Sequence, residues 1–249
     1  MAVAAKSTTE RDFQIVERGE DNKNGHPQFY YRTLRGTERS NNSLNRLSIL
    51  SENQWNYPEP ENGCGPTAML NILVWYEKYG LIKPFNQHAD NERYKRKLFV
   101  EIDRRIAAIK GIDRSQVAGI SNVDIAMTMD SLVQENSNGA IRIHTETFNA
   151  PIKLQDLLNS MQNFRSGYLT VTPKDHDTGQ MGIKHAVTLI RVDRAGYVTL
   201  ANWGQLYRGL LKQRPDGQWF IPQDPTHMEL KVHEMTRFIP FRPIAAEDR

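Results

Sequence analysis

The sequence predicts an α+β protein, and three observations lead to that class. Helical patterns concentrate in the first half of the chain, and strand patterns concentrate in the second. The two kinds of element do not alternate as they do in βαβ units, which favours an antiparallel sheet. The composition, with 39% hydrophobic and 24% charged residues, is that of an ordinary globular protein. We therefore expect a helical first half packed against a later antiparallel sheet.

Residues 1–45 are predicted to form a polar, flexible N-terminal extension, because Ser, Thr, Asn, Arg, Glu and Gly dominate them. Within this stretch, a short strand is expected at residues 29–31. Apolar content rises from about residue 46, and no long linker follows. The sequence thus predicts one domain over residues 46–249.

Charge and hydropathy argue against two classes of partner. The net charge is only +3, and the basic run at 93–97 adjoins an amphipathic stretch, so we interpret it as the solvated start of a helix rather than a nucleic-acid site. No apolar run is long enough for a membrane span. The N-terminus lacks the basic region of a Sec signal. We expect a cytoplasmic protein or one exported by a non-Sec route.

Four helices are predicted from the spacing of apolar residues. The first begins at or just after Cys64, has Pro66 in its first turn and ends before Gly80. Its apolar residues cover more than one face, which predicts a buried central helix. The other three helices are expected at 92–110, at 122–135 after Ser121 or Asn122 as the cap, and at 153–164.

Five strands are predicted, at 141–147, 168–172, 186–192, 197–203 and 219–221. Residues 193–196 are expected to join two of them as a hairpin loop. If Val192 pairs with Tyr197 in that hairpin, position 187 pairs with Asn202. Side chains alternate along a strand, so His185 and Asn202 would face the same side and lie within hydrogen-bonding reach as diagonal neighbours.

Cys64 is the one cysteine in the sequence, which excludes an intramolecular disulfide and a cysteine-rich zinc site. It lies between Gly63 and Gly65, directly before the predicted central helix. The glycines allow a substrate to come close, and the helix N-terminus favours a thiolate. This segment fits a nucleophile, and the alternative on these residues alone is a small buried core side chain.

A thiolate nucleophile needs an imidazole that exchanges its proton and a group that orients the ring. His185 opens the predicted strand 186–192 after a glycine-containing loop, with Asn202 as its predicted neighbour. His176 is the rival, although a loop histidine flanked by two acids is typically solvated. The spacing of His and carboxylate residues indicates no metal site, and no cofactor is expected.

Three motifs resemble the papain-like cysteine peptidase superfamily: residues 63–68 before a helix, 184–187 opening a strand and 202–204 closing the next strand. The chain looks most similar to the branch that includes the double-glycine, bacteriocin-processing peptidases, over about residues 47–222 in element order. The Asn-Trp-Gly tripeptide resembles the papain-type pattern, where many double-glycine peptidases carry Asp-Pro instead.

The resemblance implies a papain-like fold with a Cys-His-Asn catalytic triad. In this sequence it implies Cys64 as nucleophile, His185 as general base and acid, and Asn202 as the residue that orients the imidazole. It also implies that Trp203 shields the hydrogen bond between His185 and Asn202 from water.

The family also places a glutamine upstream of the cysteine, where its amide joins the cysteine N–H in the oxyanion hole. In papain-type enzymes this glutamine lies six positions before the cysteine, and that position here is Pro58. We assign the role to Gln54, ten positions before Cys64, provided that the intervening loop brings it back. Asn62 and Asn56 are the alternative donors.

The leading functional hypothesis is a thiol hydrolase that cleaves a peptide or isopeptide bond of a protein or peptide substrate through an acyl-enzyme. An acyltransferase on the same scaffold and a catalytically silent binding module are the alternatives, and a CHAP-type peptidoglycan amidase is a further one. The polar N-terminus without a Sec signal also suits a bacterial effector delivered by a specialised secretion system.

Overall fold

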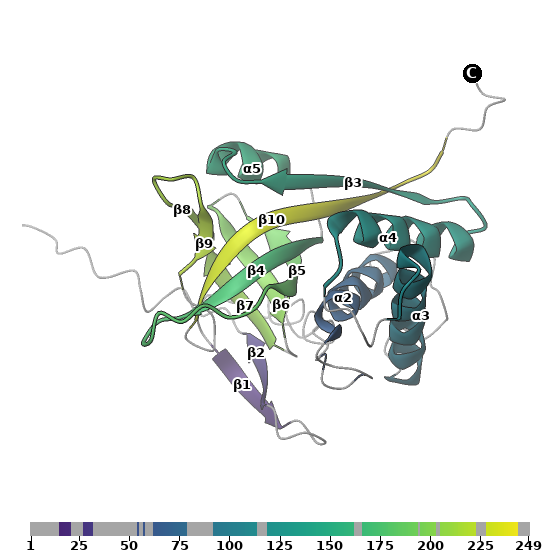
Figure 1. Ribbon diagram of the computed structural model, residues 1–249, viewed down its shortest axis with the longest axis horizontal. Helices are drawn as coiled ribbons and strands as arrows, with labels where there is room; N and C mark the ends of the chain where they lie inside the picture. Colours follow the sequence, from purple (N-terminus) through teal and green to yellow (C-terminus); the bar gives the residue numbers. More distant parts are fainter. Residues whose placement is uncertain are drawn as a thin grey trace, which may run out of the picture.

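The structure is a computed structural model of the chain and describes residues 15–20, 27–31, 54, 57, 62–78, 92–113, 119–161, 166–193, 195–202, 205–222 and 228–243. Within these residues, three helices gather on one side of an antiparallel sheet and a fourth lies on its other face (Figure 1), which confirms the predicted α+β class. No helix in the described part of the chain is long and apolar enough to cross a membrane.

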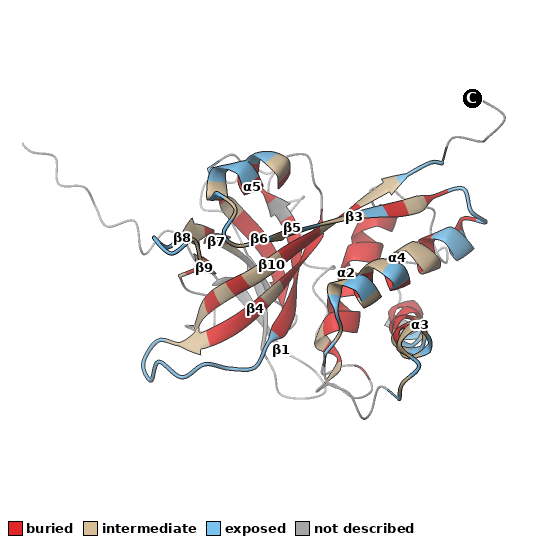
Figure 2. Cartoon of the chain, turned by 45° about the horizontal axis from the view of Figure 1, so that its top comes forward, coloured by how far each residue is buried: buried red, intermediate tan, exposed pale blue. Residues whose placement is uncertain are grey.

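The predicted helices are present, with closely similar boundaries: α2 Cys64–Lys78, α3 Glu92–Lys110, α4 Asn122–Asn136 and α5 Leu154–Met161. Of the two residues predicted as the cap of α4, Ser121 is the one that caps it. Its hydroxyl accepts a hydrogen bond from the backbone N–H of Asp124, whose carboxylate accepts one from the backbone N–H of Ser121 in return. Residues 65–77 of α2 are all buried (Figure 2), which confirms the central helix.

An antiparallel sheet of eight strands has the order β7-β6-β5-β4-β10-β9-β8, with β3 pairing to β10. The predicted strands correspond to β3 Arg142–Asn149, β4 Gly167–Asp175, β5 His185–Val192, β6 Tyr197–Asn202 and β9 Trp219–Ile221. The strands that were not predicted are β7 Gln205–Leu210, β8 Lys212–Gln213 and β10 Met228–Phe241. The longest of these, β10, pairs with β4 along one edge and with β9 and then β3 along the other.

Two further strands lie within the N-terminal 45 residues. They are β1 Ile15–Glu20 and β2 Pro27–Tyr31, which pair antiparallel. Strand β2 contains residues 29–31, where a short strand is predicted, and it lies beside β7 at the edge of the main sheet. The rest of the predicted extension lies outside the described residues.

Apolar side chains cover both faces of the sheet. One cluster joins α2, α3 and α4 to the face that carries Tyr168 and Ala186. The other lies on the opposite face with α5 and contains Leu169 and Val187. Successive residues of β4 and β5 therefore alternate between the two clusters, as the period of a strand requires. Helix α2 packs directly on β5, and the hydroxyl of Thr188 in the first half of that strand donates to the carbonyl of Ala68 near the N-terminus of the helix.

Tyr76 fastens α2 to the sheet through a buried hydroxyl group. The hydroxyl donates to the carbonyl oxygen of Phe238 at 2.5 Å and lies 3.3 Å from that of Ser166. Burial raises the pKa of Tyr76, so the group remains a donor at neutral pH.

Tyr76→Phe is expected to lower the free energy of unfolding by about 1–3 kcal/mol, because it leaves a buried carbonyl without its donor. Urea denaturation of the wild type and the variant measures the difference. A change below about 0.5 kcal/mol, the usual range for surface substitutions, would show that the hydroxyl does not stabilise the helix–sheet contact.

The β5–β6 hairpin departs from the predicted register near its loop. Val192 pairs with Val198, one residue beyond its predicted partner. A β-bulge then takes up one residue of β5, and Thr188 pairs with Ala201. One step further along, this register places position 187 opposite position 202, as predicted.

The loop itself explains the departure. Asp193 donates its backbone N–H to the carbonyl of Tyr197, so the loop has three residues rather than four. Gly196 adopts a φ of +86°, the left-handed conformation that closes such a loop. The Asp193 carboxylate also accepts hydrogen bonds from the N–H groups of Ala195 and Tyr197.

Candidate active site

Cys64 is the first residue of α2, and its neighbours on both sides are buried glycines. The backbone N–H of Thr67 donates to the carbonyl of Gly63 at 2.9 Å and closes the first turn. A Cβ atom on Gly65 would lie 2.6 Å from Cδ1 of Ile120, so a side chain there would displace the cavity wall. The thiol is partly exposed at a helix terminus that favours negative charge.

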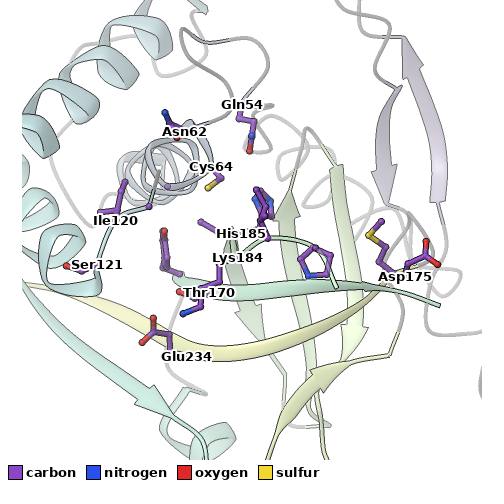
Figure 3. A pocket seen from close by; sticks show the side chains of 18 of the residues that line it. Gln54, Asn62, Cys64, Ile120, Ser121, Thr170, Asp175, Lys184, His185 and Glu234 are labelled. Carbon is purple, nitrogen blue, oxygen red and sulfur yellow. The ribbon is translucent and has the colours of Figure 1, made fainter. Parts of the chain in front are cut away.

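His185 and Asn202 form the hydrogen bond that the hairpin register predicts. The distance from Nε2 of His185 to Oδ1 of Asn202 is 2.6 Å, and both side chains are buried. Because an amide oxygen only accepts, Nε2 carries the proton and Nδ1 holds the lone pair of the neutral ring. Figure 3 shows Cys64 at the start of the helix and the His185 ring on the neighbouring strand, both at the same cavity.

Burial lowers the pKa of His185 below its ordinary value of 6.5, because the protonated ring loses hydration. The hydrogen bond to Asn202 acts in the opposite direction by favouring the protonated ring, and it is the smaller effect. The imidazole is therefore neutral at neutral pH and can accept a proton.

A cavity of about 690 Å³ opens in front of Cys64 and His185. Its floor comes from β4, β5 and β10, and its walls come from the start of α2, the residues before α4 and the loop between β4 and β5. A much smaller void, of about 10 Å³, shares part of its lining. All four residues predicted for catalysis line this void, namely Gln54, Cys64, His185 and Asn202.

Gln54 is buried and also lines the large cavity, so it lies at the same site as Cys64. Figure 3 shows its side chain directed toward the space beside Cys64 and His185. The alternative donor Asn62 lines the same cavity, whereas Asn56 lies outside the described residues.

Two other residues of the sequence analysis do not join this arrangement. The rival base His176 is exposed, lines neither cavity and has its Nε2 atom 2.6 Å from the carbonyl oxygen of Pro222. Trp203, the predicted shield, lies outside the described residues.

Sequence reasoning missed a polar contact that joins the helix to the strand behind the site. The amide of Asn71 donates to the hydroxyl of Thr188 at 3.3 Å, and that hydroxyl donates to the carbonyl of Ala68 at 3.2 Å. These bonds hold the first turns of α2 in register with β5, which carries His185. The available signal was a polar residue on the buried face of each predicted element, Asn71 in the helix and Thr188 in the strand.

Several side chains of the cavity wall were also missed, because they come from elements far apart in the sequence. They include Ile120, Tyr168, Thr170, Met228 and Glu234. Among the described residues, no group of three His, Cys, Asp or Glu side chains is placed to hold a metal ion.

No protein-family model matches the chain, and no curated protein matches it significantly.

Proposed function

We propose that this chain is a papain-like cysteine peptidase that uses Cys64, His185 and Asn202. The observation that carries the proposal is the 2.6 Å hydrogen bond between His185 and Asn202, made beside the cavity that also contains the helix-terminal thiol. A buried helix that begins at a cysteine and packs on an antiparallel sheet carrying the histidine supports the papain-like fold.

The reaction follows from the position of each atom. The proton of the Cys64 thiol passes to Nδ1 of His185 as Sγ attacks the carbonyl carbon of the substrate. The amide of Gln54 and the N–H of Cys64 stabilise the resulting oxyanion. His185 then protonates the departing amine, leaving an acyl-thioester on Cys64. Water attacks this thioester, gives its proton to His185, and releases the acid and the free thiol.

Hydrolysis is favoured over acyl transfer because water reaches the cavity. Residues 180, 182, 183 and 184 line it and are all exposed, so its rim is open to solvent. A transferase gains from excluding water from the acyl-enzyme, and an open rim does not do so.

The single thiol makes a direct test possible without a variant. We expect the protein to generate new termini in a library of peptides, detected by mass spectrometry, and to lose this activity once iodoacetamide has modified one site per chain. Release of acyl groups onto an added amine rather than onto water would indicate a transferase. Unchanged peptides with the free thiol would contradict the proposal.

Gln54→Ala is expected to lower kcat about 10²–10³-fold with little change in KM, because the amide acts mainly on the oxyanion. Steady-state kinetics on a cleaved peptide measure both constants. Asn62→Ala is the matched control, since Asn62 lines the same cavity, and it should lose less than about tenfold. The reverse order of the two losses would move the donor role to Asn62.

A further inference from the structure

A β-bulge in β10 determines which side chains of that strand reach the cavity. Val232 pairs with Val171 and Glu234 pairs with the preceding residue of β4, Thr170, so His233 is the extra residue. A bulge of this kind reverses the alternation of side chains beyond it. Without the bulge, Glu234 would share the face of Val232, which is buried in the cluster on the opposite side of the sheet.

The bulge aligns Glu234 with the floor of the cavity. Glu234 pairs with Thr170, and Thr170 pairs with Ala186, the residue that follows His185. All three line the cavity. With strands about 4.8 Å apart, the Cα of Glu234 lies about 10 Å from that of Ala186. Figure 3 shows the carboxylate on the cavity side of β10. This spacing suits a substrate side chain close to the scissile bond.

The two carboxylates that line the cavity differ in their partners. Asp175 accepts hydrogen bonds from the backbone N–H and the hydroxyl of Thr178, at 2.7 and 2.9 Å. Among the described residues, no ion pair or side-chain hydrogen bond engages the Glu234 carboxylate, which interacts electrostatically with the ring of the neighbouring His233. Glu234 is half-buried, so its charge is screened less than that of a fully exposed group.

The surrounding wall suits a long basic side chain. Tyr168 and Ile120 line the same cavity and offer apolar surface against which an aliphatic stem can pack. Lys184 also lines the cavity, but it is exposed and forms no ion pair with Glu234 within the described part of the chain. A cationic head group can therefore pair with Glu234 without breaking an ion pair or a side-chain hydrogen bond among the described residues.

We infer that Glu234 forms an ionic subsite for a lysine or arginine side chain of the substrate, within two residues of the bond that Cys64 attacks. This inference rests on the proposed peptidase function and names the substrate class for that same site. The contact is a charge-assisted hydrogen bond between the cation and the carboxylate.

Matched covalent probes test the subsite. Peptidyl chloromethyl ketones react when Sγ of Cys64 bonds to the methylene carbon, chloride leaves and the thiol proton passes to His185. The probes come in pairs, in which one carries lysine and its twin carries norleucine at the same position, either the first or the second residue from the reactive group. Each pair compares a cation with an apolar side chain of similar length. Intact-mass measurement gives the rate of each reaction.

The wild type is expected to react about tenfold faster with the lysine probe than with its norleucine twin at one of the two positions. Glu234→Gln should reduce that ratio to about one, and Asp175→Asn, the matched control, should keep it. In the unaltered protein the ratio should also fall as salt rises from about 0.01 M to 1 M.

The subsite would be overturned by equal rates for both probes in the wild type, or by a lysine preference that survives in Glu234→Gln. A third probe carries glutamate at the same position. A faster reaction with this probe would also overturn the subsite, because it would assign the cavity charge to Lys184. Rapid, His185-dependent alkylation by the norleucine probes alongside any of these would leave the proposed peptidase function intact. Alkylation of every probe at the rate of an ordinary solvated thiol would overturn the function and the subsite together.

Discussion

Cys64→Ala is expected to lower kcat/KM for peptide cleavage about 10⁴–10⁶-fold, because the acyl-enzyme cannot form without the sulfur. The chain has one cysteine, so no second thiol can supply residual activity. The free energy of unfolding should change by less than about 1 kcal/mol, since the side chain is partly exposed. Cleavage assays and urea denaturation of the same preparation measure the two quantities.

The double variant Cys64→Ala/His185→Ala separates a catalytic pair from two independent contributions. If His185 acts only through the thiol, the double variant should be no more than about tenfold less active than Cys64→Ala alone. If the loss in the double variant equals the product of the losses in the two single variants, His185 contributes independently of the thiol. Full activity in Cys64→Ala would place the nucleophile elsewhere and contradict the proposed function.

The elements that the sequence predicts well are those whose signals are local. Helix α2 is marked by its apolar run, by Pro66 in the first turn and by Gly80 after the predicted end, and α4 is marked by the Ser121 cap. The glycines around Cys64 are adjacent to it in sequence. For these features, the residues that define the structure lie within a few positions of one another.

Strand β10 could not be predicted from its own residues, although it is the longest strand of the sheet. The bulge at His233 interrupts the alternation of apolar and polar residues, so Val232 and Met235 belong to the same cluster while lying three positions apart. When a bulge shifts the alternation of apolar and polar residues within one strand, the sequence resembles an irregular polar stretch. The face of Glu234 depends on this bulge, and for that reason the candidate subsite was missed.

The contact between His185 and Asn202 was predicted correctly from an incorrect loop. The prediction began the hairpin pairing at Val192 with Tyr197, whereas the three-residue loop moves that pairing by one residue. The bulge in β5 moves it back before the strand reaches His185. The one-residue shift at the loop and the one-residue bulge in β5 cancel each other. The pairing in the part of the hairpin away from the loop is therefore the predicted one.

Two substitutions at Asn202 are expected to shift the acid limb of the pH–rate profile in opposite directions. Asn202→Leu removes the hydrogen bond that raises the pKa of His185 and keeps the site dry, so the pKa falls further below 6.5. Asn202→Asp adds a negative charge that favours the protonated ring, so the pKa rises. The neutral ring is the form that accepts the thiol proton, and it is lost as pH falls through this pKa. The acid limb should therefore move to lower pH in Asn202→Leu and to higher pH in Asn202→Asp.

The rate of Cys64 alkylation by iodoacetamide, measured from pH 4 to 9, provides the same profile without a peptide substrate. His185→Ala supplies the reference, in which the alkylation rate should follow a single titration of the Cys64 thiol, without a separate acid limb. The direction of the two shifts distinguishes a ring that exchanges protons with Cys64 from one that only fills space, because a packing defect would slow the reaction without moving its pH dependence. Identical acid limbs in the wild type and both Asn202 variants would exclude His185 as the group that titrates, and with it the proposed triad.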